Sequence, residues 1–140
     1  MLVLGVQPPV DVVQDVVERG VDQLAATRGR FMELVAAELT DISGNLADHA
    51  FMTGIMSLMP ALLQAPMEEI LDSLPLLPEV RGALETRDGT LGRLLSLAES
   101  IETNDDAVCF DLTATMAGVN SDTVNRAQTA ALAWVASIDR

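Results

Sequence analysis

Residues 50–95 read AFMTGIMSLMPALLQAPMEEILDSLPLLPEVRGALETRDGTLGRLL, and this segment carries the strongest local signals of secondary structure in the chain. It starts as a long apolar segment and is then divided by prolines, which fit the first turn of a helix but not its interior. The pattern predicts an apolar helix from about Leu46 to Gln64 that is kinked or divided at Pro60. Because this helix is apolar all round, we expect it to be buried on most sides.

Shorter helices follow within the same stretch. Pro66 opens the first of them, the Leu-Pro-Leu-Leu-Pro run at residues 74–78 ends it, and residues 79–86 form the second. The sequence Arg-Asp-Gly at residues 87–89 has the composition of a turn. A helix over residues 91–101 then has a packing stripe made of Leu91, Leu94, Leu95 and Ala98.

On the N-terminal side, residues 10–39 have the pattern of one long helix. The apolar tail of residues 1–7 and the pair Pro8-Pro9 precede it, and a polar break over residues 41–45 follows it. Its packing stripe advances by three or four residues and consists of Val17, Val21, Leu24, Arg28, Phe31, Val35 and Leu39.

On the C-terminal side, two more helices complete the pattern. The sequence Asn-Asp-Asp at residues 104–106 supplies acceptor side chains for the start of a helix that extends to about Ala117. The last helix has a stripe of Val124, Ala127, Ala131, Trp134 and Ile138. No repeat or linker interrupts residues 1–140, so the sequence predicts a single all-α domain of six or seven helices.

The composition agrees with packed helices. Of the 140 residues, 49% are apolar, but only three are Phe, one is Trp and none is Tyr. The core must therefore consist of Leu, Val, Ala, Ile and Met. A β-sandwich needs alternating runs of aromatic and β-branched residues, which this chain lacks.

The charge of the chain excludes several classes of partner. Eight arginines, no lysine and 21 acidic residues give a formal net charge of −13, which argues against binding to nucleic acid or to an anionic membrane. The apolar run at residues 50–65 contains polar breaks and falls short of about 20 apolar residues, so we expect no membrane span. The N-terminus lacks the basic start of a signal peptide, and a single cysteine forms no internal disulfide, which favours the cytoplasm.

The order and spacing of residues 50–95 resemble the C-terminal part of the HDOD domain, the HD-related output domain of bacterial signalling proteins. The form that follows an EAL domain of the cyclic di-GMP phosphodiesterase type is the most similar. Two flanking elements fit the same family, namely Arg28, Arg30, Phe31 and Glu33 and, near the C-terminus, Ala131 and Trp134. The resemblance covers about residues 22–138 and implies an HD-like helical bundle that lacks the N-terminal part of a complete HDOD domain.

The same resemblance argues against catalysis. In relatives that keep the metal site, a His-Asp doublet follows a Phe-x-x-Gly start; here Phe51 and Gly54 match the start, but Ser57 and Leu58 stand at the doublet. A hydroxyl and an isobutyl group cannot replace an imidazole and a carboxylate as metal ligands. The chain has one His in all, so we expect no metal, no cofactor and no enzymatic activity.

Arg28 interrupts an apolar stripe, so its charge must be paired or must reach solvent. We expect a buried ion pair with a carboxylate from elsewhere in the chain, and Glu33, Asp72 and Glu99 are the conceivable partners. The alternative is an anion or nucleotide contact that Arg28 shares with Arg30.

Other polar and soft residues have ordinary structural explanations. Met52, Met56 and Met59 lie on the apolar helix, where they either fill the core or form an adaptable surface for a partner. Cys109 has no base or second cysteine nearby in sequence, so we expect a small buried apolar residue. The pair Asp48-His49 resembles a reversed doublet, but we expect it to lie in the first turn of a helix that Asn45 or Asp48 caps.

The resemblance implies a non-catalytic output module of signal transduction, related to cyclic di-GMP signalling proteins, that acts by contact with an EAL or other signalling domain. Arg28, Arg30, Glu33, Trp134 and the three methionines are its candidate structural or interaction residues. The alternatives are a residual metal-dependent phosphohydrolase of the HD type and an unrelated helical adaptor. Because part of the domain is missing, a homodimer would be one way to cover an exposed apolar face.

Overall fold

The computed structural model describes residues 10–39 and 44–138, so the N-terminal tail, Pro8-Pro9 and most of the polar break lie outside the described residues. Those residues contain helices and no strand, which confirms the predicted all-α class. The helices are α1 (Val10–Ala36), α2 (Leu46–Met56), α3 (Met59–Leu63), α4 (Met67–Asp72), α5 (Pro78–Thr86), α6 (Gly89–Glu102), α7 (Asp106–Ala114) and α8 (Ser121–Ile138).

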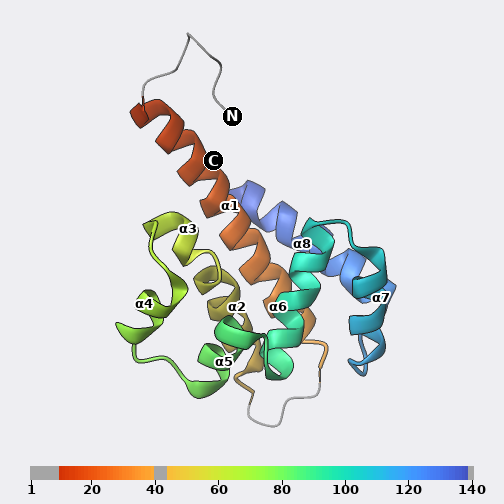
Figure 1. Ribbon diagram of the computed structural model, residues 1–140. Helices are drawn as coiled ribbons and strands as arrows, with labels where there is room; N and C mark the ends of the chain where they lie inside the picture. The colour runs from red at the N-terminus through yellow and green to blue at the C-terminus, as the bar shows by residue number, and fades with distance from the viewer. Residues whose placement is uncertain (1–9, 40–43, 139–140) are drawn as a thin grey trace.

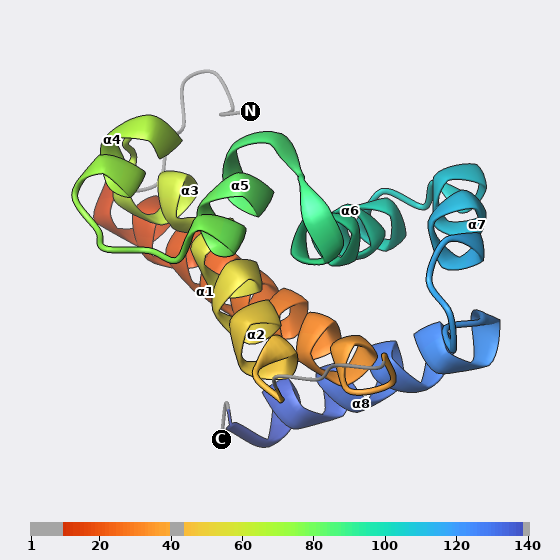
Figure 2. The same cartoon turned by 90° about the horizontal axis from the view of Figure 1, so that it is seen from below.

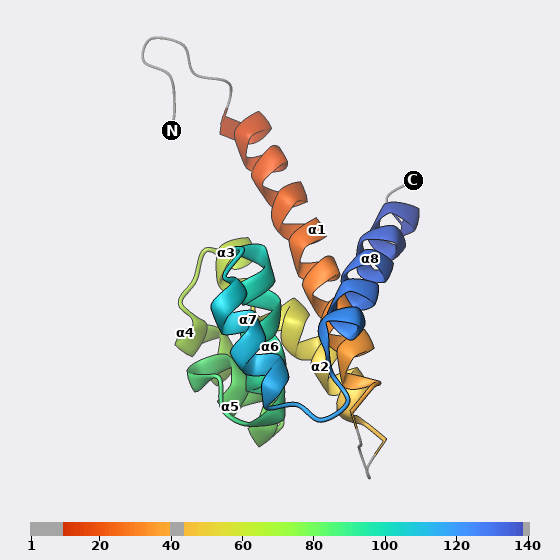
Figure 3. The same cartoon turned by 90° about the vertical axis from the view of Figure 1, so that its right-hand side faces the viewer.

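The long helix α1 is the central element of the fold. Helices α2, α6 and α8 all contact it, and α5 packs on α2 and α6 (Figures 1 and 2). Helix α7 lies on the outer side of α6. The first half of α1 projects beyond the other helices (Figure 3).

Two glycines allow α1 and α2 to touch through their backbones. A Cβ atom on Gly54 would lie 2.6 Å from the Cα of Gly29, and a Cβ atom on Gly29 would lie 2.9 Å from the carbonyl oxygen of Phe51. Real Cβ atoms do not approach other atoms so closely, because interiors are packed at van der Waals contact. The crossing of α1 and α2 therefore depends on glycine at both positions.

The hydrophobic core lies between the second half of α1 and helices α2, α4, α5, α6 and α8. The stripe predicted for α6 is confirmed, since Leu91, Leu94, Leu95 and Ala98 are all buried. Leu97 is buried as well, so α6 is covered on more than one side. The largest side chains that are fully enclosed are those of Met32, Leu71, Leu94, Leu95 and Leu97.

The apolar segment after residue 45 is divided near Pro60, which was one of the two predicted alternatives, but its burial differs from the prediction. The chain breaks at Ser57 and Leu58, so the expected helix becomes α2 and α3, with Pro60 in the first turn of α3. The buried residues of α2 are Ala50, Thr53 and Gly54, so this helix is covered on one side rather than on most sides.

Residues Leu46–Leu63 also have the length and hydropathy of a membrane span, with a mean hydropathy of 1.3 and 17% of them buried. By length and composition alone, this segment could cross a membrane, so the expectation of no membrane span stays a prediction.

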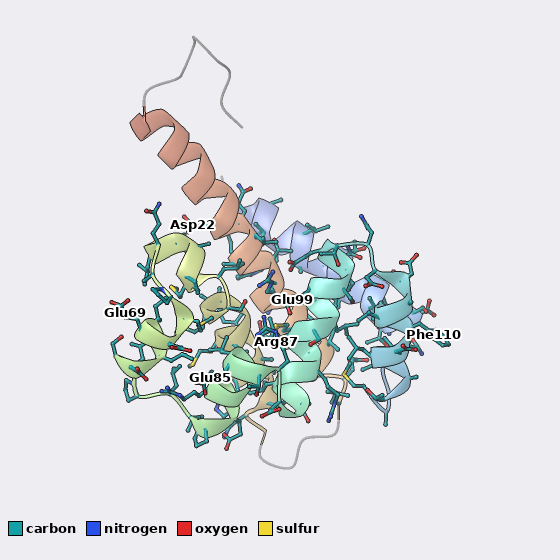
Figure 4. The ribbon with its side chains drawn as sticks, viewed as in Figure 1. Asp22, Glu69, Glu85, Arg87, Glu99 and Phe110 are labelled. Atoms are coloured by element: carbon teal, nitrogen blue, oxygen red, sulfur yellow. The ribbon has the colours of Figure 1, made fainter. Side chains whose placement is uncertain are left out.

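Ion pairs hold the short helices together. Arg87 ends α5 in the left-handed conformation, with φ of 60°, and the predicted turn at residues 87–89 leads directly into α6. Its guanidinium donates two hydrogen bonds of 2.9 Å to Glu99, and Figure 4 shows the two side chains close together. Arg81 bonds to Asp72 at 2.8 Å, and this hydrogen bond raises the pKa of Arg81 above its usual value.

The cap of the next helix is also as predicted. Asp105 is the N-cap residue of α7, and its carboxylate accepts a hydrogen bond of 3.2 Å from the backbone N–H of Val108. Helix α7 contains no buried residue and ends at Ala114, one turn before the expected end.

Candidate functional site

The structure assembles one polar cluster inside the helical bundle, from α1, the end of α2 and the end of α6. Arg28 is 7% exposed. Its Nε atom donates a hydrogen bond of 2.8 Å to Glu102, its Nη2 atom bonds to the second oxygen of the same carboxylate, and its Nη1 atom donates to the Ser57 hydroxyl at 2.8 Å. This two-point pairing orients the guanidinium rigidly, since its planar fork matches the carboxylate.

The prediction that Arg28 forms an ion pair is thus confirmed, but the predicted partners were wrong. Glu33 pairs with Arg30 at 3.0 Å, Asp72 pairs with Arg81 and Glu99 pairs with Arg87. Glu102 lies one turn after Glu99 on α6, and this turn places its carboxylate on the side that faces α1.

Ser57 occupies the place where the resemblance expects the metal-binding doublet. Its hydroxyl donates a hydrogen bond of 2.6 Å to the carbonyl oxygen of Gly54 and accepts the bond from Arg28. The sequence suggested that Ser57 is a small residue that lets two helices touch, whereas in the structure its hydroxyl group forms hydrogen bonds with Arg28 and Gly54. The guanidinium beside this residue has no lone pair to offer to a metal cation.

A cleft of about 340 Å³ opens beside the ion pair, between α1, α6 and α8. Arg28 and Glu102 line it together with mostly apolar side chains, including those of Leu24, Phe31 and Leu132. Because Glu102 neutralises Arg28, the cleft offers no unbalanced positive charge to an anion.

The structure separates Arg30 from Arg28. The Arg30 guanidinium lies 5.3 Å from the centre of the Trp134 ring, and Trp134 meets Phe51 edge to face at 6.1 Å. These contacts join α1, α2 and α8, as cation–π and aromatic pairs do in other protein cores. Arg28 and Arg30 therefore do not form the shared anion contact that was the alternative interpretation.

The three candidate methionines have different surroundings. Met52 is 44% exposed, Met56 packs against the core, and Met59 is half-buried. Cys109 is half-buried and also packs against the core. The methionines therefore form no continuous exposed surface, and Met52 is the one that a partner could reach.

His49 and Asp48 lie in the first turn of α2, where Asn45 is the N-cap residue. Asp48 is exposed and His49 is half-buried. His49 lines a second cleft, of about 710 Å³, between the starts of α2, α5 and α6, and Glu79 and Asp88 lie on its walls. Within residues 10–39 and 44–138, no three His, Cys, Asp or Glu side chains are arranged to hold a metal ion.

Two residues that matter in the structure were missed in the sequence. Glu102 closes the buried ion pair, and no local signal in the sequence distinguishes it from the other acidic residues of the chain. Phe110 is 73% exposed at the outer side of α7, and Figure 4 shows it at the edge of the molecule. Phe110 stands between Cys109 and Asp111, and this local sequence has no apolar periodicity from which its exposure could have been predicted.

Comparison with known proteins identifies a relative among bacterial signalling enzymes. The chain is 31% identical over 121 residues, 84% of its length, to cyclic di-GMP phosphodiesterase CdgJ of Vibrio cholerae. It spans about a quarter of the length of that protein, since the match covers 26% of CdgJ. No family model and no solved structure matches the chain. The chain is thus a distant homologue of one segment of a cyclic di-GMP phosphodiesterase.

Proposed function

We propose that this chain is a non-catalytic signal-transduction module of the HDOD type, which acts in the cytoplasm by contact with a protein of cyclic di-GMP signalling. The observation that carries the proposal is the pairing of Ser57 with the buried Arg28 at the place of the metal-binding doublet. Homology to a segment of CdgJ supports the connection to cyclic di-GMP. The close packing of α1 on α2 supports an HD-like bundle over an unrelated helical adaptor.

The loss of catalysis follows from the chemistry of the site. Hydrolysis of a phosphodiester by an HD-type enzyme needs a metal ion to lower the pKa of a bound water molecule. Here the nearest charged groups are Arg28, which has no lone pair for a metal ion, and Glu102, both of whose oxygens already accept hydrogen bonds. A metal ion would have to displace a buried guanidinium from its carboxylate, which costs several kcal/mol.

The surface around α7 supports a role in protein contact. Phe110 is the most exposed of the large apolar side chains of the described residues, and Val108 on the same helix is 41% exposed. Exposed aromatic residues are frequent at the energetic centres of protein interfaces. A catalytic domain of the phosphodiesterase type, on the same chain or on another protein, is the partner that we propose for this surface.

We predict that the purified chain, incubated with cyclic di-GMP and Mg²⁺, Mn²⁺ or Fe²⁺, releases no linear dinucleotide above the rate without protein. The reason is that the described residues contain no cluster of three His, Cys, Asp or Glu side chains that could hold the metal ion needed to activate water. Chromatography of the nucleotides measures the product, with full-length CdgJ as the positive control. Turnover that increases with the concentration of the chain would instead favour the residual phosphohydrolase.

The contact role predicts a second result. Phe110→Asp should remove most of the capture of a cyclic di-GMP signalling protein by the immobilised chain from its native cytoplasm, because it places a charge in the proposed interface. Leu63→Asp is the matched control, since Leu63 is also well exposed, at 61%, but lies on α3. Both substitutions should change stability by less than about 0.5 kcal/mol. Equal capture by the two variants would contradict a contact through α7.

A further inference from the structure

Helix α7 is held to the rest of the molecule by one of its faces. Its main contacts are with α6, and the side chains of Cys109 and Leu112 pack against the core. The opposite face is made of residues that follow one another at three-residue or four-residue steps, and all of them are exposed. We call this set the α7 face, and it consists of Asp106, Ala107, Phe110, Asp111 and Ala114.

One aromatic side chain stands out from the α7 face. Phe110 is 73% exposed, and its neighbours one turn before and one turn after are Ala107 and Ala114, whose methyl groups are too short to cover the ring. Figure 2 shows α7 on the outer side of α6, and Figure 4 shows Phe110 at the edge of the molecule. A partner can therefore enclose the ring and still approach the backbone of α7 closely, as grooves do when they bind a helix.

Carboxylates border the α7 face on both sides. The helical register places Asp106 at one edge of the face and Asp111 at the other. No salt bridge within the described residues includes either of them. The sequence also has no Lys, Arg or His between Arg93 and Arg126. The exposed ring therefore lies between negative charges that the chain itself does not neutralise.

We propose that the α7 face binds a partner surface with an apolar pocket for Phe110 and with Arg or Lys side chains at the rim of that pocket. The proposal rests on the protein-contact function proposed above and adds the chemistry of the partner. Rim cations would lie opposite Asp106 and Asp111, an arrangement that speeds association and selects against wrong partners. A second copy of the chain would bring the same carboxylates to the contact, and nucleic acid would bring phosphates, so repulsion disfavours both.

The test is surface plasmon resonance of the whole chain with purified full-length CdgJ as the probe. The association rate and the Kd are measured at ionic strengths from about 0.05 to about 0.5 M, a range over which salt increasingly screens exposed charges. We expect the association rate of the native chain to fall at least about tenfold over this range. Asp106→Asn with Asp111→Asn should remove most of the salt dependence and weaken binding at low salt by about tenfold.

Glu68→Gln with Glu69→Gln is the matched control. It also removes two exposed carboxylates from one short helix, α4, so both double variants have the same net charge. We expect the control to keep the salt dependence of the native chain and to change the Kd by less than about twofold. All four substitutions are at exposed positions, and fluorescence of Trp134 checks that both variants are folded.

The outcomes separate this inference from the proposed function. Binding that does not respond to salt, or equal losses in the two double variants, would overturn the basic rim and leave a contact through Phe110 in place. A native chain that does not bind CdgJ at all would contradict the proposed function and the basic rim together.

Discussion

Replacing Gly54 by alanine is expected to lower the free energy of unfolding by at least about 2 kcal/mol. In an exposed helix the same change would add about 1 kcal/mol of stability, because alanine has the higher helix propensity. Here the new methyl group would lie 2.6 Å from the Cα of Gly29 and 2.8 Å from its nitrogen, both backbone atoms that cannot rotate away. The helices must separate, and the contacts of Phe51 with Trp134 must stretch. Denaturant unfolding followed by Trp134 fluorescence measures the loss.

Gly82→Ala is the matched control for this experiment. Gly82 also lies inside a helix, α5, but the nearest atom to an added Cβ is 3.7 Å away, which is ordinary contact. We expect this variant to be as stable as the native chain or more stable, by up to about 1 kcal/mol. If Gly54→Ala behaved like Gly82→Ala, α1 and α2 would not cross through their backbones.

Replacing Glu102 by glutamine is expected to cost about 3 kcal/mol, because it leaves the guanidinium of Arg28 buried without a counter-charge. Glutamine keeps the size of the side chain and can accept one hydrogen bond, so the loss reports the charge rather than the packing. The free energy of unfolding at neutral pH measures it. A linked expectation is that Arg28→Met with Glu102→Leu recovers most of the loss, since an apolar pair can replace a buried ion pair.

Glu99→Gln provides the comparison on the same helix, one turn earlier. Glu99 is also paired with an arginine through two hydrogen bonds of 2.9 Å, but its partner Arg87 is 37% exposed, against 7% for Arg28. Exposed pairs contribute at most about 1 kcal/mol, because water screens them. Equal losses in Glu99→Gln and Glu102→Gln would show that burial adds nothing to the Arg28 pair and would contradict its role as a buried structural ion pair.

Much of the fold could be predicted because prolines, turns and apolar stripes are local signals. The helix boundaries near Pro66, Pro78 and residues 87–89 follow from the restricted backbone of proline and from turn composition. The α6 stripe also follows from its spacing alone. The break of the apolar helix at Ser57 and Leu58 could not be placed, since Pro60 is compatible with either a kink or a division.

The site was harder to predict because its contacts join residues far apart in the sequence. Arg28 and Glu102 are separated by 74 residues, and nothing local distinguishes Glu102 from Glu33, Asp72 and Glu99. Those three acids are occupied by other arginines, which becomes visible only when the helices are packed. Burial of α2 was overestimated for a related reason, since apolar composition does not tell how many neighbours cover a helix.

The most direct test of the central claim is the metal content of the purified chain after incubation with excess Mn²⁺, Fe²⁺ or Zn²⁺ and removal of the free ions. The claim is that Ser57, Arg28 and Glu102 form a hydrogen-bonded polar cluster at the place where the resemblance to the HDOD family implies a metal-binding doublet. We expect far less than one ion per chain, and Arg28→Met should not increase the amount. One or more equivalents of tightly bound metal, lost on substitution of Ser57 or Glu102, would contradict the claim.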